Sequence, residues 1–212
     1  LHQRFAQSNS YQTLHAIHPH NPRGPSVVDD VLTTGECEAL IAGIEGAPGL
    51  VLADNPLYRD QDRVIVDDPA FTIDLFTRLR PSLPAHFGPL VLEGLNPRTR
   101  RYRYRPGQRF APHTDHWYQP DRLRTTLVTV LVYLNDDFEG GETRFYEEHL
   151  ASADGAVPEQ TIAPRRGRVA LFQHKIRHEG CPVLAGTKYA LRTDVVYAAP
   201  DDCAPLTFAR PL

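Results

Sequence analysis

The chain has 212 residues, of which 41% are hydrophobic and 23% are charged, and its formal net charge is −3. This length accommodates one domain with a substantial core, and two full domains would be cramped. The acidic balance argues against a general nucleic-acid binder, and no apolar run approaches the roughly 18 residues of a membrane span. The opening residues lack the apolar core of a secretory signal, and the three cysteines have no CxxC spacing. We therefore expect free thiols and a cytoplasmic protein.

The first quarter of the chain predicts a polar lead-in followed by a helix. Residues 1–25 are polar and rich in His, Asn and Pro, which is typical of an N-terminal arm. A short strand is expected in SVVDDVL (26–32). Residues 33–46 then predict a helix with one apolar stripe, capped by Thr33 or Thr34.

A second predicted helix follows the strand-like segment DRVIVDD. It covers DPAFTIDLFTRLRPSL (68–83), with a proline near its end. Its apolar side chains are expected partly on one side, at Phe71, Ile73, Leu75 and Phe76.

From about residue 100 the pattern changes to many short strands. RRYRYRP (100–106) alternates Arg and Tyr, so Tyr102 and Tyr104 are expected on one buried face and the arginines on the other. TTLVTVLVYLND (125–136) is a nearly continuous apolar run, typical of a strand covered on both faces. We expect a turn in FEGGET, a loop over 147–160, and strands in RGRVALFQH, RHEGCPV and TKYALRTDVVY. Early helices and late strands predict an α+β fold whose β part closes as a sandwich or barrel.

A metal site is predicted by two histidines and an aspartate. His113 and Asp115 are two residues apart in FAPHTDHW, so in a strand their side chains share one face. Such a pair alone is weak evidence, and the third ligand is either His174 or His178. We favour His178, which precedes the turn EGCPV, because His174 follows the core-like strand VALF. Two imidazoles and one carboxylate leave open positions on a metal, as non-haem Fe(II) oxygenases require.

A cation close to this triad predicts an anionic ligand. Lys188 lies ten residues after His178 in an apolar strand, and a buried cation needs a partner, either Asp194 or a bound anion. Arg192 is the rival anion clamp, since its planar fork suits a carboxylate. Thr143 and Tyr104 could add hydroxyl donors to the same carboxylate, so this choice stays open from the residues alone.

The order and spacing of the motifs resemble a known family. They are similar to the prolyl 4-hydroxylase-like branch of the 2-oxoglutarate- and Fe(II)-dependent oxygenases, with gaps, from about Val27 to Tyr197. The resemblance implies a double-stranded β-helix, or jelly roll, with flanking N-terminal helices. It implies a single dioxygenase domain over 26–212, with helical support in 26–97 and the jelly-roll core in 98–199. The motifs that carry it are YRPGQRFAPHTD, TVLVYLNDDFEGGETRF, GRVALF, HEGCPVLAGTKYALRTDVVY and the early VVDDVLTTGECEALI.

The resemblance also implies roles for individual residues. His113, Asp115 and His178 would bind Fe(II), Lys188 would bind the far carboxylate of 2-oxoglutarate, and Tyr104 would help to bind this co-substrate. The implied reaction consumes 2-oxoglutarate and O₂, releases succinate and CO₂, and hydroxylates a second substrate. Ascorbate is expected as a reductant.

The leading hypothesis is therefore an oxygenase that hydroxylates an aliphatic C–H bond of a prolyl-type peptide residue or of a small molecule. No nucleic-acid or membrane partner is expected. The alternatives are a metal-free jelly-roll binding module, a zinc protein, and an oxidative demethylase. One departure makes collagen-type peptides doubtful, because Thr126 stands where related hydroxylases place a substrate-facing Arg, and Arg124 is a weak substitute. The arm and the 147–160 loop are expected to gate the substrate.

Overall fold

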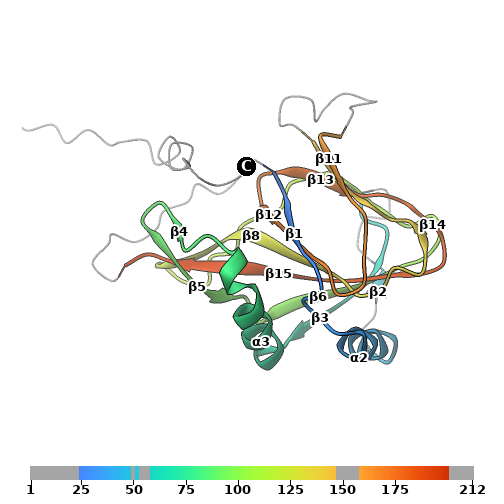
Figure 1. Cartoon of the computed structure of the whole chain (residues 1–212), viewed down its shortest axis with the longest axis horizontal. Coiled ribbons are helices and arrows are strands. Elements are labelled where there is room, and N and C mark those ends of the chain that lie inside the picture. The colour runs from blue at the N-terminus through green and yellow to red at the C-terminus, as the bar shows by residue number, and fades with distance from the viewer. Residues whose placement is uncertain (1–23, 49–50, 53–57, 147–157, 201–212) are drawn as a thin grey trace, which may run out of the picture.

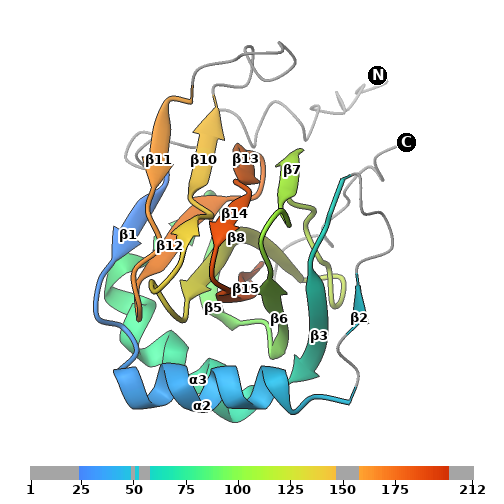
Figure 2. The same cartoon turned by 90° about the vertical axis from the view of Figure 1, so that its right-hand side faces the viewer.

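The computed structural model describes residues 24–48, 51–52, 58–146 and 158–200. Residues 1–23 of the predicted arm, most of the 147–160 loop and one of the three cysteines, Cys203, lie outside these described ranges. Two antiparallel sheets dominate the described part, and both helices lie on the outer side of the larger one (Figures 1 and 2).

The larger sheet carries nine strands within the described part, and β5 pairs with the second half of β15. Seven strands follow one another across it in the order β1 (Ser26–Val28), β12 (Val169–Gln173), β8 (Arg124–Tyr133), β15 (Lys188–Ala198), β6 (Arg98–Tyr104), β3 (Asp62–Asp67) and β2 (Val51–Leu52). The other two are β5 (Leu90–Leu95) and its partner β4 (His86–Phe87).

The smaller sheet lies opposite the larger one and supplies the second wall of the molecule (Figure 2). Its described strands run in the order β11 (Gln160–Ile162), β10 (Thr143–Tyr146), β13 (Arg177–Gly180) and β7 (Phe110–His113). A separate pair joins β9 (Glu139–Gly140) to β14 (Val183–Ala185).

The helix α2 (Thr34–Glu45) begins as the sequence predicts, with Thr33 as its cap. The Thr33 hydroxyl accepts from the Glu36 N–H, and the Glu36 carboxylate accepts from the Thr33 N–H at 2.7 Å, which is a complete capping box. Arg78 then donates to Glu36 at 2.6 Å and joins α2 to the second helix.

The helix α3 (Pro69–Leu79) is followed by a 3₁₀ turn, η1 (Arg80–Ser82). Asp68 caps α3, and the buried side chains are Thr72, Leu75 and Leu79. The predicted contribution of Ile73 to the apolar side is wrong, because this side chain is 67% exposed. Positions three and four residues apart share a helix face, and Ile73 falls outside the face that Leu75 and Leu79 define.

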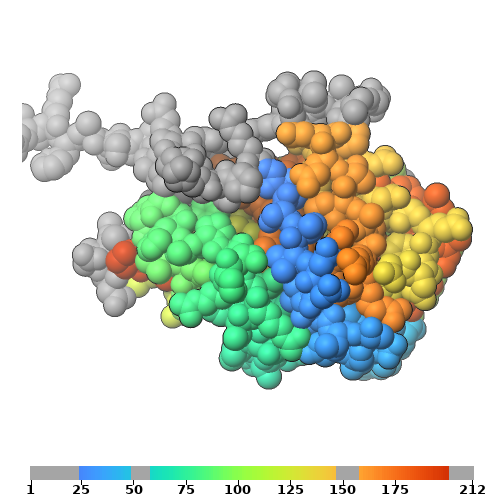
Figure 3. Space-filling model, viewed as in Figure 1, coloured from blue at the N-terminus to red at the C-terminus, as the bar shows by residue number. Residues whose placement is uncertain are grey.

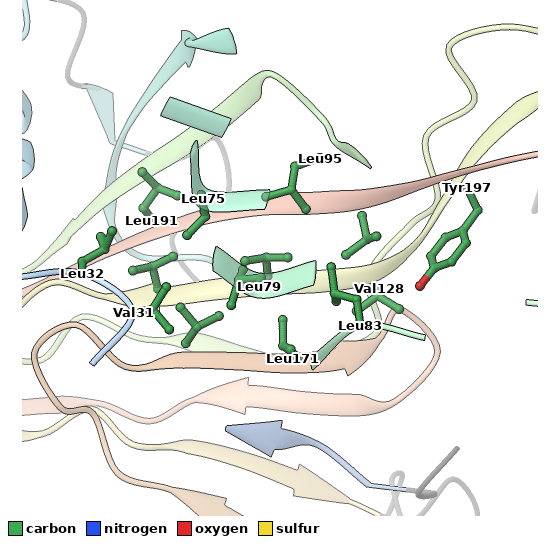
Figure 4. Packing of buried hydrophobic residues seen from close by; sticks show 14 of the residues in the cluster. Val31, Leu32, Leu75, Leu79, Leu83, Leu95, Val128, Leu171, Leu191 and Tyr197 are labelled. Carbon is green, nitrogen blue, oxygen red and sulfur yellow. The ribbon is translucent and has the colours of Figure 1, made fainter. Parts of the chain in front are cut away.

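The main hydrophobic core lies between the helices and the larger sheet (Figure 4). Leu75 and Leu79 from α3 meet Val128, Leu171 and Leu191 from three neighbouring strands. On the face shown in Figure 3, β1 lies between the α3 region and β12, with which it pairs. The early part of the chain thus contributes strands to the larger sheet as well as both helices.

Several short strands were not expected from the sequence. The apolar alternation of β5 and β14 is too brief to recognise, and the predicted turn FEGGET contains β9 and the start of β10. Gln160, predicted as loop, lies in β11 opposite Phe145. These elements form because their partners in the sheets satisfy their backbone groups, which local sequence does not reveal.

Candidate metal centre

Three potential metal ligands converge between the two sheets. His113 ends β7, His178 lies directly opposite it in β13, and Asp115 follows two residues after His113. Asp115 Oδ1 lies 3.7 Å from His113 Nε2, and Asp115 Oδ2 lies 3.7 Å from His178 Nε2. All three side chains are buried, and one donor atom from each lies within 4.8 Å of the others. The predicted grouping of these residues is present.

His113 and Asp115 do not lie in one strand, contrary to the prediction. The alternation argument places His113 and Asp115 in one strand, but β7 ends at His113. The Asp115 N–H instead donates to the carbonyl of His174 at 2.8 Å, outside the ladder of the smaller sheet. Asp115 is therefore aimed by contacts with the larger sheet, and His174 supports it through its backbone.

Both imidazoles present the same nitrogen to the site. His113 Nδ1 lies 2.8 Å from the Ala111 carbonyl, and His178 Nδ1 lies 2.9 Å from the Ile176 carbonyl. A carbonyl only accepts, so each Nδ1 carries the proton and each Nε2 keeps its lone pair. Burial lowers the pKa of His113 to about 3, and burial also lowers the pKa of His178. Both rings are therefore neutral and suited to bind a metal.

A network on the larger sheet holds the Asp115 carboxylate. Thr129 of β8 donates to Oδ2 at 2.5 Å, and Arg192 Nη1 of β15 lies 2.9 Å from Oδ1. Arg192 Nη2 also donates to Asp194 at 2.9 Å. Burial alone would raise the pKa of Asp115, but the charged Arg192 guanidinium outweighs it and holds this pKa below its usual value. The carboxylate is charged and fixed from both sides.

Asp194 completes this network beneath the site. Its side chain is 1% exposed and contacts Arg100 at 3.2 Å, Arg192 and, at 3.4 Å, the His174 ring. Of the two partners considered for Lys188, Asp194 is therefore engaged by other side chains. The sequence reasoning also missed Thr129, although a threonine in the run TLVTVLV is a recognisable polar interruption.

Lys188 lies deep in the space beside the triad and is 4% exposed. Its Nζ donates to the Gly141 carbonyl at 2.7 Å and lies 5.2 Å and 5.6 Å from the ring centroids of Tyr104 and Tyr133. No carboxylate in the described part of the chain pairs with it. Burial lowers the pKa of Lys188 to about 8. The neighbouring Gly141 has φ 69°, a conformation that favours glycine.

Two hydroxyl groups accompany Lys188. Tyr104 lies opposite it in the β6–β15 register, and Thr143, on β10, is 2% exposed. The Tyr133 hydroxyl donates to Thr143 Oγ1 at 2.7 Å, which leaves the Thr143 proton for another acceptor. Tyr133 was not singled out from the sequence.

One pocket joins the triad to Lys188, Tyr104 and Thr143. Seven residues singled out from the sequence line it: Tyr104, His113, Asp115, Thr143, His178, Lys188 and Arg192. Gly107, with φ 87°, lies in the turn between β6 and β7, which do not pair. The turn carries the chain from the larger sheet to the smaller one, so Tyr104 and His113 face each other across the pocket.

Comparisons with known proteins agree with this geometry. Residues 99–193 match the sequence model of the 2OG-Fe(II) oxygenase superfamily. The matched stretch includes the triad and Lys188. Prolyl 4-hydroxylase 1 of Arabidopsis thaliana is 31% identical over 103 residues, which cover 42% of this chain and 36% of that protein. Probable prolyl 4-hydroxylase 8 of the same plant is 29% identical over 113 residues, covering 41% and 37%. The chain thus covers little more than a third of the length of these relatives.

Solved structures confirm the predicted fold class. A Pseudomonas putida prolyl-4-hydroxylase aligns with TM-score 0.60 and 20% identity over 84% of this chain and 94% of that one. A Trichoplax adhaerens prolyl hydroxylase, in complex with a hypoxia inducible factor peptide fragment, aligns with TM-score 0.60 and 17% identity over 89% and 94%. The domain is a double-stranded β-helix with flanking helices. No helix within the described residues is long and apolar enough to cross a membrane.

Proposed function

We propose that this chain is a 2-oxoglutarate- and O₂-dependent oxygenase that hydroxylates an aliphatic C–H bond and releases succinate and CO₂. The observation that carries the proposal is the single pocket that contains both a buried two-histidine, one-carboxylate cluster and a buried cation without a carboxylate partner among the described residues. The family match over 99–193 supports it.

The donor set fits Fe(II). His113 and His178 offer neutral Nε2 atoms, and Asp115 offers a charged carboxylate, which is the ligand set of non-haem iron oxygenases. Bound Fe(II) would supply the centre at which 2-oxoglutarate and O₂ react. Thr129 and Arg192 hold Asp115 in place, so the ligand needs little reorganisation when the metal binds.

Lys188 is the residue we assign to the far carboxylate of 2-oxoglutarate. Its ammonium is buried and hydrogen-bonded to one carbonyl, so two of its three donors are free for an anion. Thr143 offers one further hydroxyl proton, and Tyr104 borders the same space. Arg192 fits this role less well, because both of its terminal nitrogens already contact carboxylates.

The second substrate is proposed to be a prolyl-type peptide residue or a small molecule, as the prolyl hydroxylase relatives suggest. Thr126 cannot act as a substrate-facing cation, and its hydroxyl accepts from the Tyr118 N–H at 2.8 Å. Arg124 contacts Glu93 at 3.2 Å and does not line the pocket. No cation of β8 therefore lines the pocket to support peptide recognition of the collagen type.

The alternatives have less support. A zinc hydrolase does not need a carboxylate clamp such as Lys188. The arginines that suggested a nucleic-acid demethylase are engaged elsewhere, since Arg103 and Arg105 both donate to Asp62. We keep a single domain over 26–212 and a cytoplasmic location as proposals, together with ascorbate as the reductant.

The test is succinate formation from 2-oxoglutarate with Fe(II) and ascorbate, without a second substrate, beside a metal-free control. We expect slow iron-dependent turnover that is lost in His178→Ala. His116→Ala is the matched control, since His116 is exposed and outside the pocket. Calorimetry with 2-oxoglutarate gives an independent reading. No succinate and no 2-oxoglutarate binding would favour the binding module or the zinc protein.

A further inference from the structure

A second cation lies close to the candidate metal ligands. The guanidinium carbon of Arg59 lies 4.4 Å from the ring centroid of Phe110. The Phe110 ring stacks on His113, with centroids 3.5 Å apart and planes 16° apart. Because His113 covers one face of this ring, Arg59 covers the other. One aromatic ring therefore separates the Arg59 charge from a predicted iron ligand.

The backbone around Arg59 is held in place. Arg59 forms a β-bridge with Phe110, the Asp60 N–H donates to the Arg109 carbonyl at 2.9 Å, and the Ala111 N–H donates to the Tyr58 carbonyl at 2.8 Å. These bonds extend the smaller sheet beyond β7 by one short segment. The position of Arg59 against Phe110, which lines the pocket, is thus set by sheet hydrogen bonds.

The Arg59 charge is not neutralised by its neighbours in sequence. Asp60 accepts from Gln108 at 3.0 Å, and Asp62 accepts from Arg103 and Arg105. No described carboxylate contacts Arg59, and its Nε is buried without a hydrogen-bond partner. Arg59 as a whole is only partly buried, but a buried Nε is costly unless a partner satisfies it.

Two further polar groups lie on the same stretch of chain. Arg63 pairs in register with Tyr102, which lines the pocket, so the two side chains lie on one face of the sheet. No described carboxylate pairs with Arg63. Gln61 is fully buried, and neither its amide nitrogen nor its amide oxygen has a partner within the described residues. The segment from Arg59 to Arg63 therefore offers positive charge and unused hydrogen-bonding groups together.

We propose that Arg59, assisted by Arg63, binds a carboxylate of the second substrate, and that this substrate is a small organic acid such as a free amino or imino acid. The inference rests on the proposed function.

Lys188 lies against Tyr104 and Tyr133, whereas Arg59 lies against Phe110, so the two cations bind separate anions. The reaction is R–H + O₂ + 2-oxoglutarate → R–OH + succinate + CO₂, in which one oxygen atom enters each organic product.

The test measures succinate formation above the uncoupled rate with the common amino acids, proline included, and with the carboxamide of each. We expect stimulation by one or more free acids and not by the matching amides. Arg59→Ala should lower kcat/KM for a stimulating acid by about tenfold or more, because it removes a charge-assisted hydrogen bond. Its KM for 2-oxoglutarate in uncoupled turnover should not change. Arg109→Ala is the matched control, since Arg109 is exposed beside Phe110.

Each other outcome has a defined meaning. Equal stimulation by acids and amides, or an unchanged kcat/KM in a folded Arg59→Ala protein, would refute the proposal. A raised KM for 2-oxoglutarate in Arg59→Ala would assign this cation to the co-substrate instead. Stimulation only by a peptide with a blocked C-terminus would replace the small acid by a peptide. Arg59→Lys, which keeps the charge, should recover part of the activity. If the unmodified protein shows no uncoupled turnover, this result would count against the proposed function itself.

Discussion

The two faces of β8 and β15 are equally buried and chemically opposite. Toward the helices these strands present Val130 and Leu191, both fully buried among apolar side chains. Toward the smaller sheet they present Thr129 and Asp194, which are also buried but polar, and the partly buried Arg192. Strand alternation allows both, since neighbouring residues point to opposite sides. The comparison shows that burial alone does not mark a core, and that the partner of each buried side chain decides its role.

The polar face is stable because its groups satisfy one another. Arg192 bridges Asp115 and Asp194, and Thr129 donates to Asp115. Such a network keeps its charges paired in low dielectric, where a single unpaired member would be expensive. The apolar face gains its free energy from area removed from water instead. Substitutions on the polar face should therefore lower activity, and substitutions on the apolar face should lower stability.

The largest effect is expected on the polar face. Asp115→Ala should lower iron-dependent succinate formation by at least about 100-fold, because changes to residues that only support a metal ligand already cost 10–100-fold. The fold should persist, since Arg192 keeps its contact with Asp194. Co(II) binding by calorimetry should fall as well. Asp67→Ala, at an exposed position of β3, serves as the control. Normal turnover in Asp115→Ala would remove this residue from the predicted triad.

The apolar face should respond in stability. Leu191→Ala removes a fully buried side chain next to Arg192 in sequence, and we expect a loss of about 2–5 kcal/mol in the free energy of unfolding, measured in urea. The folded fraction should keep its 2-oxoglutarate KM. Leu184→Ala, at a leucine that is 70% exposed, should change stability by less than about 0.5 kcal/mol. A similar loss in both variants would contradict the assignment of the core.

The role of Lys188 on the polar face can be tested by the pH dependence of the KM for 2-oxoglutarate. Lys188→Ala should raise the KM for 2-oxoglutarate about tenfold or more, and Lys175→Ala, at an exposed lysine, should not. Burial lowers the pKa of Lys188 to about 8, so its charged form is present below this pH and is lost above it. The KM should therefore rise between pH 7 and pH 9. Lys188→Arg should show a flat profile, because a guanidinium stays charged. A flat profile in the unmodified protein would place the clamp elsewhere.

The smallest effect is expected outside both faces, at the α2 cap. Hydrogen bonds from Arg78 and then Thr33 lower the pKa of Glu36 to about 2 from an ordinary value of 4.5. A carboxyl with a lowered pKa in the folded state stabilises the fold above its unfolded pKa and loses this contribution as the pH falls. Glu36→Gln should cost less than about 1 kcal/mol at pH 7, because the pair is partly exposed. Denaturation curves should converge with those of the unmodified protein between pH 4.5 and pH 2. Glu38→Gln is the exposed control.

Local sequence predicted what depends on local pattern. The α2 cap, the alternation of Tyr102 and Tyr104 and the grouping of His113, Asp115 and His178 follow from spacing, motif order and family resemblance. The partners of Asp115 could not be predicted, because they depend on the register between β8 and β15, where Asp194 lies opposite Thr129. In the same register Arg192 contacts both Asp115 and Asp194, and Asp194 forms no ion pair with Lys188. The roles of the individual site residues stay predictions until the variants are measured.

The turn at Gly141 acts as a spacer for the ligand that Lys188 would bind. A Cβ atom there would lie 2.9 Å from the Phe138 ring and 3.1 Å from Lys188 Cδ, at a φ that side chains rarely adopt. The Gly141 carbonyl also accepts a hydrogen bond from the Lys188 ammonium and so fixes the position of this charge. The length of diacid that spans from the triad to this ammonium is therefore determined by backbone geometry. Redesign of the co-substrate range would begin at a residue that has no side chain.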